Sequence, residues 1–130
     1  KIKLISNEPH IVVLTEFHTT LLNEARLLNS HSPFLFPHQD GTQPRKADSL
    51  TQAIYRFCKN TEFEHFTARD LRRTWKTLAG SIGIDLELRN RIQGHALQDV
   101  GSRNYDRYDY LDEKRVAMKS WSDWLKGLLI

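Results

Sequence analysis

Residues 67–110 read TARDLRRTWKTLAGSIGIDLELRNRIQGHALQDVGSRNYDRYDY, and the rest of the chain is organised around this stretch. Thr67 and Asp70 place a hydroxyl at a cap position and a carboxylate in the first turn, which is typical of the start of a helix. Apolar residues then recur at helical spacing, at Leu71, Trp75, Leu78 and Ile82. A helix is therefore predicted to begin at Thr67 and to end near Gly80 and Gly83.

Further helices are predicted on both sides of this one. Asp85 caps a short helix with Leu88 and Ile92 turned inward, and Gly94 ends it. Apolar spacing predicts three more helices. The first runs from Thr15 to about Leu28, and the second begins at Asp48 or Ser49 and has Leu50, Ala53, Ile54 and Phe57 on one face. The third runs from Leu111 to Leu129 and has an apolar stripe at Met118, Trp121, Trp124, Leu125 and Leu128. We expect this stripe to be core rather than a groove for a partner.

The N-terminal part of the chain has a β-rich pattern. The runs Lys1–Ile5 and His10–Leu14 are separated by the turn-forming residues 6–9, which predicts a β-hairpin. Residues 29–45 hold three of the four prolines and read as a loop, in which Phe34–Phe36 is apolar enough for a short buried strand. The predicted fold is thus mainly α, with a small β-hairpin or sheet at one edge, and without a repeat or a second domain.

Charge is distributed unevenly in a chain of ordinary globular composition. The chain has 130 residues, a formal net charge of +3 and a pI of about 9.1. Basic residues gather in one segment, at Arg69, Arg72, Arg73, Lys76, Arg89, Arg91, Arg103 and Arg107. Such clustering can supply phosphate contacts, and a solvated basic face is the alternative.

Several classes of site and location are not expected. Cys58 is the only cysteine, so it cannot form an intramolecular disulfide, and we expect it to be buried in a helix of a protein from a reducing, cytosolic compartment. The six histidines are scattered without metal-ligand spacing, so no metal site is predicted. No apolar run approaches the roughly 20 residues that span a bilayer.

Arginine, histidine and tyrosine remain as candidates for chemistry. Arg69 and Arg72 share a helix face near a helix N-terminus, where both guanidinium groups can approach one anion. The alternative is that they pair with nearby carboxylates, namely Asp70, Glu64 or Asp85. After Gly94, His95 can project as a hydrogen-bond donor, and Tyr105 follows as a possible nucleophile. Tyr108 and Tyr110 compete with Tyr105 for that role, and packing is the alternative for all three.

Taken in order, these residues resemble a known family. Residues 69–74 (RDLRRT), the pair Gly94-His95, residues 105–110 (YDRYDY) and residues 113–115 (EKR) look like the catalytic domain of a tyrosine recombinase, closest to phage and genomic-island integrases. The resemblance covers most of the chain from the predicted hairpin onward. It implies the DNA breaking-rejoining fold, N-terminally truncated, with residues 1–130 forming the C-terminal part of an integrase catalytic domain.

The resemblance also implies roles for individual residues. Arg72 would hold the non-bridging oxygens of the scissile phosphate, His95 would donate a hydrogen bond to it, and Tyr105 would attack phosphorus to leave a 3′-phosphotyrosyl link. Lys3, with Lys1 as the alternative, would protonate the leaving 5′-oxygen. Arg69 stands where the family usually has a histidine, so it can bind phosphate but cannot act as a general base. Contacts to the DNA would come from Arg73, Lys76, Arg91, Arg103 and Arg107.

The implied function is site-specific recombination of a mobile element or prophage, by strand cleavage and rejoining without a metal or other cofactor. The expected partners are double-stranded DNA and further copies of the protein, as a tetramer on DNA, in a bacterial or phage-derived, cytoplasmic and nucleoid-associated setting without a membrane. The family's first arginine has no counterpart here, so we expect it upstream and expect the isolated fragment to be inactive. The main alternative is a non-catalytic DNA-binding module. A helical protein-interaction domain built on the Trp121, Trp124 and Leu128 stripe is a third.

Overall fold

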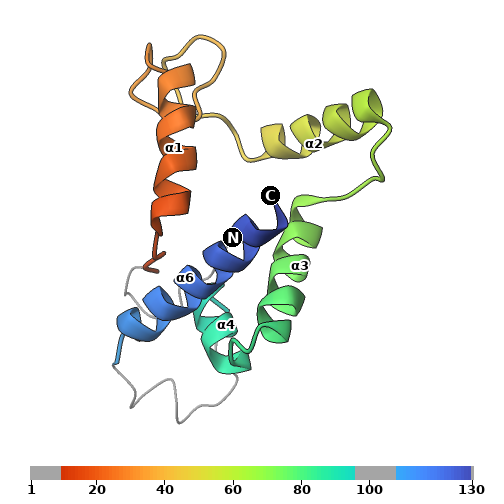
Figure 1. The fold of residues 1–130 in the computed structure, drawn as a ribbon. Helices are drawn as coiled ribbons and strands as arrows, with labels where there is room; N and C mark the ends of the chain where they lie inside the picture. Colours follow the sequence, from red (N-terminus) through yellow and green to blue (C-terminus); the bar gives the residue numbers. More distant parts are fainter. Residues whose placement is uncertain (1–9, 96–107, 130) are drawn as a thin grey trace. The chain divides into compact units, whose positions relative to one another are not determined.

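The computed structural model describes residues 10–95 and 108–129, and this part of the chain is mainly helical (Figure 1). Its helices are α1 (Glu16–Leu28), α2 (Asp48–Thr61), α3 (Ala68–Ser81), α4 (Leu86–Ile92) and α6 (Leu111–Leu128). The described residues divide into two compact units, one with residues 10–17, 76–95 and 108–129, and the other with residues 18–75. None of these helices is long and apolar enough to cross a membrane.

The predicted β-hairpin is not observed. Residues 1–5 lie outside the described residues, but His10–Leu14 forms no strand, and Ile11, Val12 and Leu14 are exposed. β-branched side chains favour a pleated, half-buried surface, and this preference has no effect without a partner strand. The run instead leads directly into α1, and the hydroxyl of Thr15, the residue before that helix, is 2.8 Å from the Ser122 hydroxyl of α6.

The prediction of a short buried strand at Phe34–Phe36 is also wrong. These residues form bends, and Phe36 is 59% exposed. Local side-chain bonds replace strand pairing here, because the buried Ser32 hydroxyl donates to Gly41 O at 2.7 Å and accepts from Phe34 N at 3.1 Å. Among the described residues, β pairing is limited to one isolated bridge, between Pro37 and Pro44.

The predicted bounds of α1 and the start of α2 at Asp48 are confirmed, but the predicted apolar face of α2 is only partly correct. Ile54 and Cys58 are the buried residues of α2, which confirms the burial of Cys58, whereas Leu50 and Phe57 are exposed. The ring of Phe57 instead meets those of Phe63 and Phe66, at centroid distances of 5.8 and 6.3 Å. The connection after α2 therefore packs on the end of that helix.

A reciprocal capping arrangement begins α3 and confirms the predicted start. Thr67 Oγ1 accepts from Asp70 N at 3.3 Å, and the Asp70 carboxylate accepts from Thr67 N at 3.0 Å and from the Thr67 hydroxyl at 2.7 Å. These bonds satisfy amide groups that the first helical turn leaves without intrahelical partners. The sequence signal for this helix is local, and so its start could be predicted without knowledge of the rest of the fold.

The corner between α3 and α4 is built from glycine and aspartate in the way the sequence predicts. Gly83 has φ +88°, and the bonds Ile84 N to Ala79 O (3.0 Å) and Gly83 N to Gly80 O (3.1 Å) form a Schellman turn. Asp85 then caps α4, because its carboxylate accepts from Glu87 N at 2.8 Å and from Leu88 N at 3.4 Å. The predicted start and end of α4 are confirmed.

The core of the first unit lies between this corner and α6. Its buried apolar residues are Ala79, Ile84, Ala117, Met118 and Trp121. The indole of Trp124 stacks on that of Trp121 at 5.0 Å, and α4 lies against α6. The first part of the predicted stripe is therefore core, whereas Leu128, near the end of α6, is 62% exposed.

Candidate active site

Three arginines lie near the start of α3. Arg69 and Arg72 are exposed, and their spacing places them on the same helix face. Arg73 pairs with Asp70 at 3.3 Å, and Arg69 has no ion pair with a described carboxylate. Of the carboxylates weighed as alternative partners, Asp70 is thus used by Arg73. The capping bonds from Thr67, and then the Arg73 charge, hold the pKa of Asp70 below its ordinary value.

His95 stands at a fixed place after α4. A second Schellman turn ends that helix, with Gly94 at φ +65°, Gly94 N bonded to Arg91 O at 3.2 Å, and His95 N bonded to Asn90 O at 2.9 Å. A Cβ on Gly94 would lie 3.3 Å from the His10 imidazole, so glycine is required here both by its backbone angle and by its neighbour. The His95 side chain is exposed.

Lys76 and Arg89 connect α3 to α4 near His95. Lys76 Nζ donates to Asn90 Oδ1 at 2.7 Å, and Asn90 is the residue whose carbonyl accepts from His95 N. Arg89 Nη1 donates to Lys76 O at 2.6 Å, and a Cβ on Gly80 would come within 2.7 Å of that nitrogen. Gly80 therefore leaves room for the guanidinium of Arg89 against α3. Lys76, predicted as a phosphate ligand, has an internal partner in the structure.

Arg91, also predicted as a phosphate ligand, contacts a carboxylate and an aromatic ring of the protein. Its guanidinium donates to the Glu87 carboxylate at 3.0 and 2.7 Å, and its Cζ lies 3.8 Å from the centroid of the Tyr110 ring. Only 14% of the Arg91 side chain is exposed. Arg91 therefore joins α4 to the residue that precedes α6.

Tyr108 can be distinguished from an activated nucleophile. Its hydroxyl is hydrogen-bonded to Glu113, and this bond, followed by the charges of Glu113 and other nearby carboxylates, raises the pKa of Tyr108 above its ordinary value. A nucleophilic tyrosine needs the opposite, since activation favours the phenolate. Its ring lies 4.8 Å from that of Tyr110 in an edge-on arrangement.

The remaining predicted site residues, Tyr105, Lys3 with its alternative Lys1, Arg103 and Arg107, lie outside the described residues, and their roles stay predictions. The structure places Arg69 and Arg72 on one face of α3 and fixes the backbone of His95 at the end of α4. That His95 and both arginines bind one phosphate stays a prediction as well. Within residues 10–95 and 108–129, no group of three His, Cys, Asp or Glu side chains could hold a metal ion.

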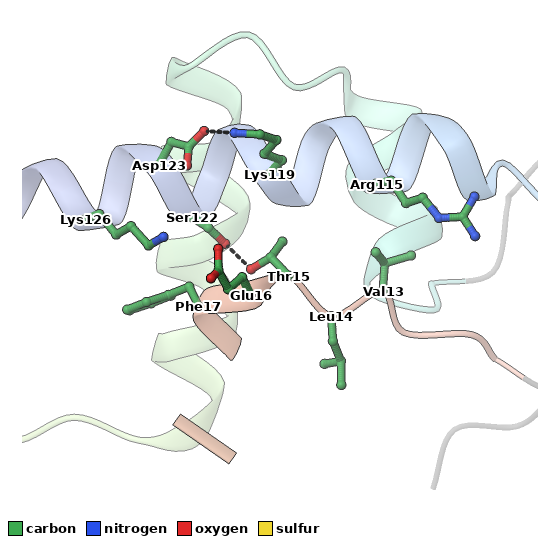
Figure 2. Close-up of a pocket in the computed structure, with 10 residues that line it drawn as sticks. All are labelled: Val13, Leu14, Thr15, Glu16, Phe17, Arg115, Lys119, Ser122, Asp123 and Lys126. Carbon is green, nitrogen blue, oxygen red and sulfur yellow. Dashed lines mark hydrogen bonds and ion pairs between the residues drawn. The ribbon is translucent and has the colours of Figure 1, made fainter. Parts of the chain in front are cut away.

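A cleft of about 260 Å³ lies elsewhere, between residues 13–17 and α6 (Figure 2). Its lining has charges of both signs, including Glu16, Asp123, Lys119 and Lys126, and Lys119 Nζ pairs with Asp123 at 2.7 Å. None of the described residues predicted for catalysis or DNA binding lines it. The mixed charge makes this cleft a poor fit to a polyanion.

A second hollow, of about 250 Å³, was not predicted. It is lined by His38, Gln39, Arg45, Ser49 and Arg56. Arg45 and Arg56 lie outside the basic segment that the sequence singles out, and the loop before α2 brings them to the same hollow. The signal that was available is the position of Arg45 just before α2 and of Arg56 in the middle of that helix.

Comparisons of this chain with protein-family models, with curated proteins and with solved structures found no match.

Proposed function

We propose that the protein containing this chain is a tyrosine recombinase, which cleaves and rejoins DNA strands through a 3′-phosphotyrosyl intermediate. The observation that carries the proposal is the ordered set Arg72, Gly94-His95 and Tyr105. It is supported by the exposure of Arg72 on α3 and by the Schellman turn that sets His95 three residues beyond the end of α4.

The proposed chemistry uses only side chains of the protein. The Tyr105 oxygen attacks phosphorus and releases its proton to solvent water, while the bond from phosphorus to the 5′-oxygen breaks. Lys3 supplies a proton to that leaving oxygen and regains one from solvent. Arg72 binds the non-bridging oxygens with its planar fork, and His95 donates one further hydrogen bond as negative charge builds up. A phosphodiester is exchanged for another phosphodiester, so the 5′-hydroxyl of a second strand can reverse the step without an energy source.

Covalent trapping tests the proposal. The complete gene product that contains this chain is incubated with a duplex nicked close to the cleavage site, so that the short 5′-hydroxyl strand diffuses away and religation fails. The proposal predicts a protein–DNA adduct that survives denaturant. Arg72→Lys should reduce its rate by orders of magnitude, because one lost contact to the developing charge costs about 3 kcal/mol. Binding of DNA without any adduct would instead favour the non-catalytic DNA-binding module.

A further inference from the structure

The hollow beside α2 has a lining that is cationic and polar. Two of its residues, His38 and Gln39, come from the loop before α2, Arg45 follows that loop, and Ser49 and Arg56 belong to α2. All of these residues lie in one compact unit, so a single folded body supplies the whole lining. It has no carboxylate among its residues.

The loop of residues 37–44, directly before Arg45, is held closed by its own backbone. The Pro37–Pro44 bridge is flanked by His38 N to Gln43 O at 2.7 Å and Arg45 N to Phe36 O at 2.8 Å. The Nε of Arg45 then donates to Pro37 O at 3.1 Å, which restricts the direction of its guanidinium. Arg45 is therefore oriented before any ligand binds, and this reduces the entropy lost on binding.

Arg56 borders the same hollow from the middle of α2. Its Nε donates to Gln52 O, one turn earlier in the helix, at 3.3 Å. In both arginines the hydrogen bond uses Nε, and no described acceptor is bonded to the terminal nitrogens. Those nitrogens form the part of the guanidinium that binds a phosphate oxygen pair.

The two arginines at the hollow have no carboxylate partner among the described residues, whereas His38 is paired with Asp40. Arg73, Arg91 and Arg115 each pair with a carboxylate, whereas Arg45 and Arg56 have no ion pair with a described carboxylate. Asp40 is close to His38, at 3.5 Å, but its carboxylate also accepts from Thr42 N at 3.0 Å and does not line the hollow. Two like charges at one hollow repel each other, and a bound anion would relieve that repulsion.

The N-terminus of α2 adds to the positive electrostatic potential at the hollow. Ser49 lies in its first turn, and the residue before the helix, Ala47, makes no side-chain capping bond. The positive end of the helix dipole therefore faces this region, opposed by one first-turn acid, Asp48. We propose that Arg45, Arg56, Ser49 and His38 form a phosphate-binding site, and that its ligand is a backbone phosphate of double-stranded DNA. The choice of DNA as the source of the phosphate rests on the proposed function.

The salt dependence of DNA binding tests this site in the 130-residue chain. The slope of log K against log salt concentration reports the number of phosphates neutralised, at about 0.9 per phosphate for duplex DNA. The double variant Arg45→Gln/Arg56→Gln should weaken binding of a short random-sequence duplex and reduce the slope by about 1. Arg115→Gln is the matched control, because Arg115 is exposed and pairs with Asp112, and it should leave the slope unchanged. An unchanged slope in the double variant would overturn the site.

Two further arms separate the possible causes. The variant Arg45→Lys/Arg56→Lys keeps both charges and therefore should retain most of the salt slope. It also controls for a folding defect caused by replacing the two arginines. A decrease in slope equal to that of the Gln variant would overturn the electrostatic account. Titration with inorganic phosphate alone, followed by amide shifts at Ser49, tests the other source. If free phosphate binds saturably but the double Gln variant has the same DNA slope as the wild type, the site does not bind DNA and the assignment to DNA is overturned.

This test is independent of the cleavage test. If the complete protein forms no covalent adduct but the Gln variant still lowers the slope, the proposed function fails and the phosphate site stands. If the adduct forms and the slope does not change, the site fails and the proposed function stands.

Discussion

The guanidinium of Arg91 lies over the ring of Tyr110, with its Cζ 3.8 Å from the ring centroid. The same guanidinium is bonded to Glu87, one turn earlier in α4. Tyr110 precedes α6 and has φ 56°, a left-handed conformation that is uncommon for a residue with a Cβ. Stacking by Arg91 therefore helps to hold the strained residue at the start of α6 against the end of α4.

A double-mutant cycle measures this stacking. Arg91→Met and Tyr110→Leu each remove one partner and keep apolar bulk, and we expect a coupling free energy of about 1 kcal/mol from chemical denaturation, within the range for partly desolvated cation–π pairs. Arg115→Met with Tyr110→Leu is the matched cycle, and its two changes should simply add. Additivity in the Arg91 cycle would show that the contact contributes nothing to stability.

The Gly94 turn gives a prediction that contrasts two glycines. Gly94→Ala should destabilise the protein by about 1–3 kcal/mol, because φ is +65° and the new Cβ would lie 3.3 Å from the His10 imidazole. Gly127→Ala, inside α6 with nothing within 4 Å of the new Cβ, should instead stabilise it by about 0.5–1 kcal/mol. Thermal unfolding of both variants checks this, and equal effects would contradict the assigned geometry.

The cap of α3 predicts a specific acid sensitivity. The pKa of Asp70 is lowered in the folded state, so its contribution to stability is present above the ordinary pKa of 3.8 and is lost as pH falls through the folded value. Asp70→Asn should therefore be less stable than wild type at pH 7, and the gap should close on acidification below about pH 4. Denaturation at several pH values provides the measurement, and a gap that stays constant with pH would contradict the predicted role of the carboxylate.

Tyr108 provides a spectroscopic prediction. Its pKa is raised chiefly by the hydrogen bond to Glu113, so Glu113→Gln should move it downward, toward 10.0. Titration of the tyrosine ring by NMR would follow the change at this one residue. Tyr110→Leu serves as the comparison, because it removes the neighbouring ring and leaves the carboxylate in place. A Tyr108 pKa that does not respond to Glu113→Gln would remove the argument that sets Tyr108 apart from a nucleophile.

Helix positions could be predicted wherever the signal is local. Thr67 with Asp70, Asp85, and the glycines at 83 and 94 each satisfy or release backbone groups within a few residues, and the bounds of α3 and α4 follow from them. The predicted strands at 10–14 and 34–36 failed because β propensity specifies a surface and leaves the partner open.

The contacts of charged residues were predicted less well than helix bounds inferred from capping residues. Arg91 was assigned to DNA by its place in a basic segment, and its partners Glu87 and Tyr110 depend on how α4 packs against the start of α6. Conversely, no sequence pattern indicates that Arg45 and Arg56 lie together, because only the fold of the 37–44 loop brings them to the same hollow. A charge pattern gives the sign of a surface, whereas tertiary contacts decide which side chains remain available.

Mapping the residue that carries the DNA tests the central claim most directly. The adduct trapped on a nicked duplex is digested with nuclease and then with trypsin, which separates residues 104–107 (NYDR) from residues 108–114 (YDYLDEK). We predict that mass spectrometry finds the nucleotide on Tyr105 in the first peptide, and that Tyr105→Phe abolishes the adduct while Tyr108→Phe retains it. A nucleotide on the second peptide, or an adduct that persists in Tyr105→Phe, would contradict the account.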